Sequence, residues 1–309
     1  MIEIFLKTLP FFAVIGLGYW AGRTKFFSEE ATAYLTKFVF YFALSAMIFR
    51  FAATLELKEI LDRDFVLAYL SATAAIYVLA TLAARARGVS VAEAAVEAQC
   101  SVIGNVGFLG IPMLALLMGP ASIGPLIIIL AVDLIVFGSL IVILITGSQG
   151  DGFRLGVLKT VALGLVKNPM IVSMALGLTW SSFELPMPVP VDEFLTLLGA
   201  AATPGALFAI GASLAGKSAE KLSVAVTISA FKLFVHPAAV AVSALCIWQV
   251  DPFAAKVMIA ASALPVAGNI FIVAQHYRVA PQRASAAILV TTLLSVVTVA
   301  AAIAWIETL

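Results

Sequence analysis

The chain has 309 residues, of which 63% are hydrophobic and 11% are charged, whereas soluble domains carry roughly 25% charged residues. This composition excludes a soluble fold and indicates a protein whose surface is solvated by lipid. The net charge of +1, without any basic stripe, argues against a nucleic-acid partner. The two cysteines lack CxxC spacing, so we expect no metal site, no disulfide framework and no cofactor beyond a coupling ion.

Apolar stretches long enough to cross a membrane, about 20 residues each, recur along the whole chain. They predict an all-α polytopic protein with ten transmembrane helices and no separate soluble domain. The candidate spans lie near residues 4–22, 32–53, 65–84, 94–118, 122–146, 157–181, 192–215, 221–249, 253–276 and 284–306. The loop near Ser148–Gly152 is the natural midpoint, which divides the chain into residues 1–150 and 151–309. We also expect an amphipathic interfacial segment at Leu55–Asp62 and a stiff extended linker at Pro186–Pro190.

The distribution of Lys and Arg over alternate loops predicts the orientation in the membrane. With the N-terminus outside, one side receives most of the basic residues: Arg23, Lys25, Lys37, Arg85, Arg87, Arg154, Lys159, Lys167, Lys217, Lys221, Arg278 and Arg283. The opposite side receives Lys7, Arg50, Lys58, Arg63 and Lys256. The richer side belongs in the cytoplasm, so we expect an inner-membrane protein with both termini on the non-cytoplasmic side.

Two polar motifs marked by glycine and proline interrupt the fourth and ninth spans, at Ser101–Pro112 and Ala263–Gln275. A helix in lipid must satisfy its own backbone, so such breaks are tolerated only where protein or a water-filled cavity surrounds them. Gly104 permits unusual backbone angles and close approach, and Pro265 removes a backbone donor. Paired interruptions in corresponding halves of a chain indicate the binding site of a secondary transporter.

Weak internal matches relate the two halves of the chain. Leu17–Trp20 in the first span resembles Leu176–Trp180 in the sixth, with Gly18 and Gly177 separated by 159 positions. Leu35-Thr36 and Leu195-Thr196 are separated by 160, and Gly104 and Pro265 by 161. Five spans are an odd number, so the second copy enters from the opposite face. The matches therefore predict two inverted five-helix repeats whose broken helices 4 and 9 cross near the midplane.

The breaks predict a site for an anion. The N-terminus of a half-helix exposes unpaired N–H groups and the positive end of its dipole, so it binds an anion without a buried cation. Asn105 and Asn269 add neutral donors and acceptors beside the two breaks. We therefore expect these two asparagines to contact the substrate.

Three ionisable residues lie within predicted spans. Asp133 is in mid-span, where a carboxylate costs about 2.5–3.5 kcal/mol, so we expect it to face the interior and bind a proton, a cation or a polar substrate. The alternatives are a protonated carboxyl or a structural pair with Lys232. Lys232 and His236 lie one turn apart on the eighth span and are candidates for coupling or charge pairing. Alternatively, Lys232 extends to the cytoplasmic surface, and His236 binds backbone that Pro237 frees.

These motifs identify a resemblance to the auxin efflux carrier family, specifically to its bacterial members, over nearly the whole chain. The residues that carry it are Gly104–Pro112, Lys167-Asn168-Pro169 with Gly177, Phe231–Pro237 and Ala263–Asn269. The resemblance implies the fold of bile-acid symporters and sodium/proton antiporters. It implies a scaffold domain from helices 1, 2, 6 and 7, a transport domain from helices 3–5 and 8–10, and an elevator-like motion. Homodimers are usual in plant members.

The resemblance also implies roles for particular residues. Asn105 matches a substrate-contacting asparagine, and Ser45 falls near a scaffold serine that faces the substrate. Gly104 stands where plant members have a crossover proline, and Asp133 stands where they have a polar, uncharged residue. The long cytoplasmic loop of plant members is absent here. Bacterial relatives are usually described as carriers of small carboxylates such as malonate or malate.

Three functions compete on the sequence alone. The first is a secondary transporter of a small organic anion such as malonate, malate or an auxin-like acid, with H⁺ or Na⁺ as the coupling ion; no Walker A motif is present. The second is a cation-coupled or cation/proton exchanger that uses Asp133. The third, a membrane enzyme with Ser213 and His236, is disfavoured because the two residues are expected at different depths.

Overall fold

The computed structural model describes residues 2–54, 62–149, 155–216 and 222–309, and these residues are almost entirely helical. The first half contains α1 (Ile2–Arg23), α2 (Glu29–Phe38), η1 (Val39–Ala43), α3 (Leu44–Ala53), α5 (Arg63–Ala86), α6 (Val91–Val102), η2 (Val106–Gly110), α7 (Ile111–Met118), η3 (Pro120–Ser122), α8 (Ile123–Val132), η4 (Asp133–Phe137) and α9 (Gly138–Gln149). The second half contains α10 (Leu155–Lys167), α11 (Pro169–Ser182), α12 (Val189–Ala200), α13 (Ala202–Leu214), α14 (Leu222–Ala230), η5 (Phe231–Val235), α15 (His236–Val242), η6 (Ser243–Ile247), α16 (Pro252–Ser262), α17 (Asn269–His276) and α18 (Pro281–Ile306). Apart from the short 3₁₀ turn η3, each η element is a π-helical turn within a longer helix.

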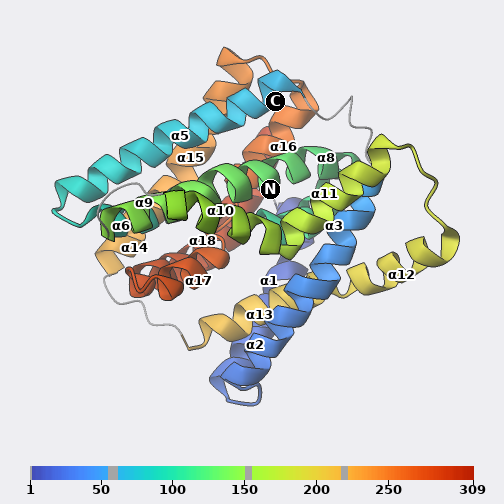
Figure 1. Cartoon of the computed structure of the whole chain (residues 1–309), viewed down its shortest axis with the longest axis horizontal. Helices are drawn as coiled ribbons and strands as arrows, with labels where there is room; N and C mark the ends of the chain where they lie inside the picture. The colour runs from blue at the N-terminus through green and yellow to red at the C-terminus, as the bar shows by residue number, and fades with distance from the viewer. Residues whose placement is uncertain (1, 55–61, 150–154, 217–221) are drawn as a thin grey trace.

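The helices form two groups that lie side by side in Figure 1. One group contains α1, α2, α3, α11, α12 and α13, in which α1 packs along α13 and α3 packs along α11. The other contains α5 to α9 and α14 to α18, in which α5 packs on α6 and α14 packs on α18. The remaining helix, α10, contacts both α9 and α11 and so connects the two groups. Each group therefore draws helices from both halves of the sequence.

Glycines allow the backbones in the first group to touch. A Cβ added to Gly18 on α1 would lie 2.1 Å from the carbonyl oxygen of Phe208 on α13. A Cβ added to Gly177 on α11 would lie 2.6 Å from the carbonyl oxygen of Phe49 on α3. Residues 18 and 177, and residues 49 and 208, are each 159 positions apart, so the two contacts are copies of each other. Such small-residue contacts are typical of helix packing in membranes.

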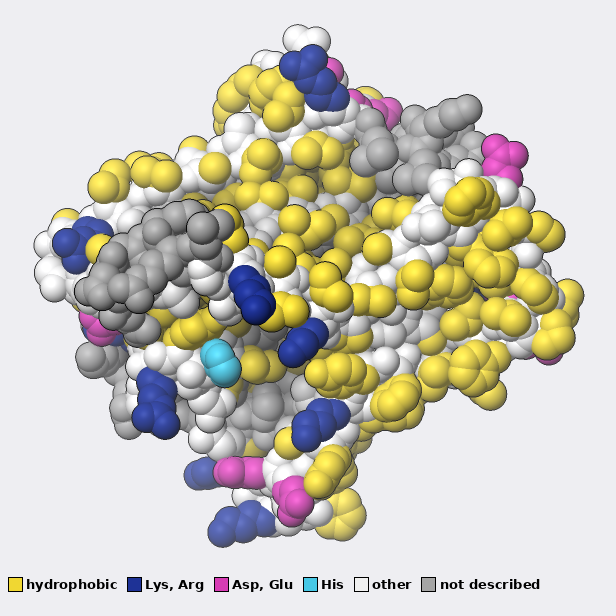
Figure 2. All heavy atoms as spheres, viewed as in Figure 1, with side chains coloured by type: hydrophobic (Ala, Val, Ile, Leu, Met, Phe, Trp, Pro, Cys, Tyr) yellow, Lys and Arg dark blue, Asp and Glu magenta, His cyan; other side chains and the backbone are white. Residues whose placement is uncertain are grey.

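The exterior is rich in hydrophobic side chains. Figure 2 shows them over much of the visible face, with charged side chains mainly toward its lower left and its margins. Within the described ranges, six helical segments are long and apolar enough to cross a membrane: Glu29–Ala53, Arg63–Ala86, Pro120–Ser148, Val189–Leu214, Ser223–Ile247 and Pro281–Ile306. The protein is thus a helical polytopic membrane protein, while the count of ten spans stays a prediction.

Two expectations about local structure need correction. The sixth span is not one rod: Leu158–Lys167 and Pro169–Ser182 meet at an angle of 69°, because the Asn168 side chain caps α11 by accepting a hydrogen bond from the N–H of Met170. The extended linker ends earlier than expected, at Pro188, and Pro190 lies in the first turn of α12, where proline is tolerated. The predicted segment 55–62, except Asp62, and most of the predicted midpoint loop lie outside the described residues.

Candidate functional site

The first break follows α6, a helix with a strong start. Ser90 and Glu93 form a capping box there, in which each side chain binds the backbone N–H of the other residue. The helix ends at Val102, and Ile103 takes an extended conformation. A second helical stretch, η2 followed by α7, begins at Val106. Gly104 therefore lies between two helical segments, α6 and η2.

The second break follows α16 in the same way. The Asp251 side chain caps α16 by accepting hydrogen bonds from the N–H groups of Phe253 and Ala254, each at 3.0 Å. The helix ends at Ser262, and α17 begins at Asn269. Pro265 lies in this break, where its missing N–H costs no helical hydrogen bond.

The two breaks pair with each other as a short antiparallel β-bridge between Gly104 and Val266. The N–H of Asn105 donates to the carbonyl of Pro265 at 2.8 Å, and the N–H of Ala267 donates to the carbonyl of Ile103 at 3.2 Å. The two donors, residues 105 and 267, are 162 positions apart, and so are the two acceptors, residues 103 and 265. A shift of 162 positions therefore relates one hydrogen bond to the other. The backbones of the two breaks therefore meet at this bridge.

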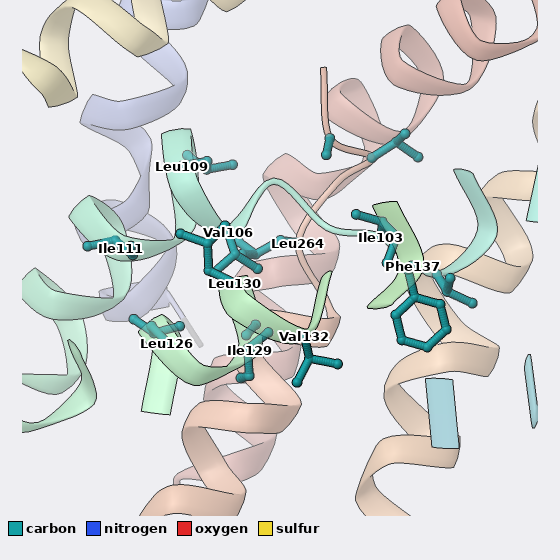
Figure 3. Close-up of a cluster of buried hydrophobic side chains, with 14 of the residues drawn as sticks. Ile103, Val106, Leu109, Ile111, Leu126, Ile129, Leu130, Val132, Phe137 and Leu264 are labelled. Carbon is teal, nitrogen blue, oxygen red and sulfur yellow. The ribbon is translucent and has the colours of Figure 1, made fainter. Parts of the chain in front are cut away.

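Close packing surrounds the crossing (Figure 3). Ile103 and Leu264 from the two breaks gather there with Val106 of η2 and Leu130 of α8, and all four side chains are buried. A Cβ on Gly104 would lie 3.1 Å from the carbonyl oxygen of Ala261, so glycine permits the close approach. The crossing is thus a fixed element rather than a chance contact of two loops.

The two asparagines stand at the starts of the second half-helices. Asn105 is 6% exposed, and its Oδ1 accepts a hydrogen bond from the N–H of Phe108 at 3.3 Å, which caps η2. The Asn105 side chain makes no other hydrogen bond to the described residues. Asn269 is the first residue of α17 and is exposed, and its side chain has no hydrogen-bond partner among them. Both amide groups are therefore available to a ligand beside the N-terminal ends of half-helices.

Asp133 is buried in the interior, as predicted. It is 3% exposed and begins the π-helical turn η4, and such turns frequently occur at functional sites. Its Oδ1 accepts a hydrogen bond from the Tyr69 hydroxyl at 2.8 Å, whereas its Oδ2 has no partner among the described residues. A buried oxygen without a partner is costly, so Asp133 remains a candidate site for a proton or a cation.

Lys232 and His236 are both fully buried on the segment η5–α15. The Lys232 Nζ donates to the carbonyl oxygen of Ser262 and lies 3.5 Å from the Nδ1 of His236. The Nε2 of His236 lies 3.1 Å from the Oγ1 of Thr73. Extension of Lys232 to the surface is therefore wrong, and the His236 ring contacts side chains rather than only the backbone that proline frees. Asp133 and Lys232 are near enough for their charges to interact, but their described side chains form no direct ion pair.

Ser45 forms no hydrogen bond with the other predicted site residues among the described residues. Its hydroxyl donates to the carbonyl of Phe40 at 3.1 Å, within its own helical segment. The Phe40 ring, however, stacks on Phe108 of η2, with centroids 6.2 Å apart. The segment that carries Ser45 therefore borders the crossing, although no described contact joins Ser45 to Asn105 or Asn269.

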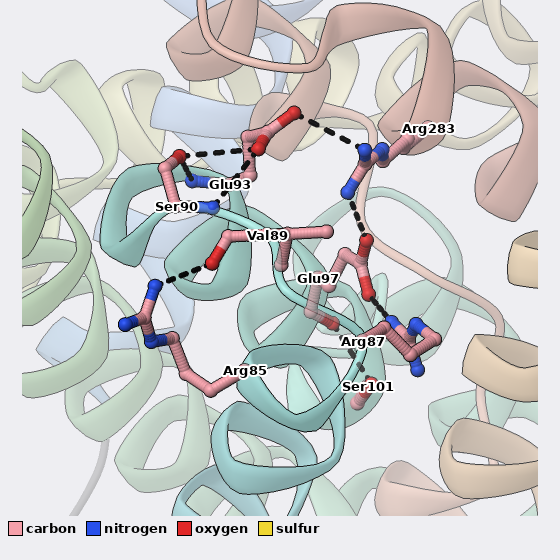
Figure 4. A network of polar contacts seen from close by, with 8 residues as sticks. All are labelled: Arg85, Arg87, Val89, Ser90, Glu93, Glu97, Ser101 and Arg283. Carbon is pink, nitrogen blue, oxygen red and sulfur yellow. Dashed lines mark hydrogen bonds and ion pairs between the residues drawn. The ribbon is translucent and has the colours of Figure 1, made fainter.

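Sequence reasoning missed the partners of the buried ionisable residues. Tyr69 and Thr73 are one turn apart on α5, and this spacing in an apolar span was the only available signal. It also missed an ion-pair cluster around the buried Glu97 of α6, shown in Figure 4. There Glu97, 2% exposed, accepts hydrogen bonds from Arg87 of the α5 end and from Arg283 of α18, the latter at 2.5 Å. This cluster joins helices from both halves of the sequence.

The structure gives no support to a serine-dependent enzyme. The Ser213 hydroxyl donates to the carbonyl of Ile210 at 2.8 Å, and the His236 ring is occupied by Thr73 and Lys232. Among the described residues, no three His, Cys, Asp or Glu side chains are grouped so that they could hold a metal ion.

A family model described as "Membrane transport protein" matches residues 3–303. The chain belongs to this family. It is 30% identical over 305 residues to the "Putative malonate transporter" of Rhizobium meliloti (strain 1021), covering 97% of this chain and 94% of that protein. It is 26% identical over 301 residues to the "Uncharacterized transporter YfdV" of Escherichia coli (strain K12), covering 94% and 93% of the two chains. The resemblance to the auxin efflux carriers is confirmed, and the protein is a membrane transporter rather than an enzyme.

Proposed function

We propose that this member of the membrane transport protein family is a secondary transporter of a small organic anion, such as malonate, malate or an auxin-like carboxylate. The single observation that carries the proposal is the backbone pairing between Gly104 and Val266, which joins two helix breaks from the two halves of the chain. Discontinuous helices of this kind hold substrates in secondary transporters. The relative whose printed name specifies malonate supports a small carboxylate as the substrate.

The proposed membrane fold has ten spans in two inverted repeats. The mirrored glycine contacts at an offset of 159, and the hydrogen bonds that exchange at an offset of 162, support a twofold relation between the halves. Helix packing supports it as well, because α1–α13 corresponds to α11–α3 under that relation. Both termini then face away from the cytoplasm, as the basic residues predict.

The proposed binding chemistry uses helix ends and neutral amides. η2 and α17 present their N-terminal ends near the crossing, where partial positive charge attracts a carboxylate. The amides of Asn105 and Asn269 then donate hydrogen bonds to it. Because Asn105 and Asn269 are uncharged, these two residues leave no uncompensated positive charge when the site holds no substrate.

The proposed motion is elevator-like. The scaffold is the group α1, α2, α3, α11, α12 and α13, and the transport domain is the other group, which contains both breaks. The stack of Phe40 on Phe108 lies at the boundary between them. A ring stack slides at a smaller cost than a hydrogen-bonded contact, which suits a boundary that moves. A homodimer, which is usual in plant members, is part of the proposal.

A cation-coupled or cation/proton exchanger is the second candidate function, and the partnerless Oδ2 of Asp133 is the observation that favours it. A cation at that oxygen would sit beside the Tyr69 hydroxyl. The nearby charge of Lys232 opposes a second cation there, which is why the anion carrier is preferred.

Flux through the purified protein in proteoliposomes tests the two candidates. We expect labelled malonate to enter proteoliposomes that are loaded with unlabelled malonate. We expect labelled sodium not to enter when malonate is absent. Asn105→Ala and Asn269→Ala should abolish malonate flux, whereas Gln275→Ala, which removes an exposed amide near the far end of α17, should retain it. Sodium flux without any carboxylate would instead support the exchanger.

A further inference from the structure

The buried ammonium of Lys232 stands at the C-terminal end of the half-helix α16. We infer that this ammonium is a built-in replacement for a monovalent coupling cation at the crossing of the two breaks. This inference deepens the proposed function, and its consequence for coupling rests on that function. Lys232 is 0% exposed and comes from η5, so a neighbouring helix supplies the charge to the break.

The carbonyls at the end of α16 show why a cation belongs there. The last carbonyls of a helix lack helical partners and carry the negative end of its dipole. At α16, backbone N–H groups of Ala263 and Leu264 satisfy the carbonyls of residues 259–261. The next carbonyl, that of Ser262, accepts from Lys232 instead. In transporters with discontinuous helices, such ends coordinate the coupling ion.

The ammonium also reaches the other broken helix. Lys232 Nζ lies 3.4 Å from the position that a Cβ on Gly104 would occupy, so it borders the bridge between the breaks. A cation bound to the Ser262 carbonyl from solution would have to occupy the same space. One covalently attached charge therefore binds the second break and borders the first.

The surrounding groups keep this charge compensated. His236 presents Nδ1 to the ammonium, and the carboxyl of Asp133 is near enough for the two groups to interact electrostatically. Tyr69 binds that carboxylate from α5. The result is a crossing that holds together without a dissolved sodium ion, and a transport cycle that does not need one.

The test is the melting temperature of purified variants in salts of different cations, a measurement that does not depend on the substrate. Lys232→Met keeps the length of the side chain and removes the charge. In buffer whose sole cation is N-methylglucamine, which is too large for the site, we expect it to melt about 5 °C below the wild-type protein. Methylammonium or Na⁺ should restore more than half of this loss.

Lys256→Met is the matched control, because it removes the same charge from a partly buried position on α16 itself. Its melting temperature should be the same in every salt. Equal melting of Lys232→Met in all salts would overturn the inference. If Lys232→Met does not fold, the wild-type protein provides the test. Equal melting temperature and equal malonate flux in Na⁺ and in N-methylglucamine support the inference. A requirement for Na⁺ overturns it. Loss of malonate flux with the cation rescue intact would refute only the proposed substrate.

Discussion

Substitution of Asn105 separates its structural role from its proposed role in substrate binding. Its Oδ1 caps η2 through the N–H of Phe108, while its amide nitrogen donates no hydrogen bond to the described residues. Serine also caps helices well, so Asn105→Ser keeps an oxygen for the cap and removes the amide donor. Asn105→Ala removes both.

The magnitudes follow from these two contacts. Loss of the cap in Asn105→Ala should cost about 1 kcal/mol of stability, which lowers the melting temperature by about 2 °C, whereas Asn105→Ser should melt like the wild-type protein. Loss of one hydrogen bond to a charged carboxylate costs about 1.5–3 kcal/mol. Both variants should therefore bind malonate about 10-fold to about 100-fold more weakly.

Calorimetric titration of malonate and thermal melting in the same detergent provide the two readouts. The reasoning fails if Asn105→Ser binds malonate as tightly as the wild-type protein, because its amide would then not contact the substrate. It also fails if the two variants melt alike, because the contact with Phe108 would then contribute nothing as a cap.

Three further substitutions test other parts of the structure. Gly211→Ala places a Cβ 1.9 Å from a backbone oxygen of α1, so it should lower the melting temperature. In the control Gly16→Ala, the added Cβ meets nothing within 4 Å, so the melting temperature should not fall. Equal melting temperatures of the two variants would contradict the packing argument. Asp133→Asn keeps an oxygen for its tyrosine partner and should flatten the pH dependence of malonate flux, and an unchanged pH profile would assign the residue to structure. Glu97→Gln leaves two arginines without their buried carboxylate and should lower the free energy of urea unfolding by about 3–5 kcal/mol. Glu93→Gln, at a more exposed position, should lower it by about 1 kcal/mol or less. Equal losses in the two variants would refute the buried ion pair.

The breaks and the relation between the halves were accessible from the sequence because they depend on glycine and proline. Gly104 and Pro265 restrict the backbone wherever they stand, so their positions predict interruptions without knowledge of neighbours. Gly18 and Gly177 correspond in the comparison of the two sequence halves, and in the structure each allows the close approach of two helix backbones. The predicted spacing at the crossing was 161, and the hydrogen bonds give 162.

The partners of the buried charges were not accessible, because they depend on which helices become neighbours. Lys232 is equally compatible in sequence with a surface position and with a bond to a carbonyl 30 residues later. Asp133 was expected to face inward, but nothing in its own span indicates Tyr69, which is 64 positions away. The bend at Asn168 was missed for a different reason: an apolar stretch of suitable length conceals a capped helix start within it.

The distribution of close contacts favours motion between the two helix groups. Gly18 with Phe208 and Gly177 with Phe49 bring helices together at backbone distance inside the proposed scaffold, and Gly104 with Ala261 does so inside the other group. At the boundary, a Cβ on Gly107 of η2 would instead meet the terminal methyl of Met170, at 2.5 Å. A methionine side chain is flexible and makes no directional bond, so it can follow a moving neighbour. Backbone contacts therefore hold each helix group together, while an adaptable side chain lies at the boundary between the two groups.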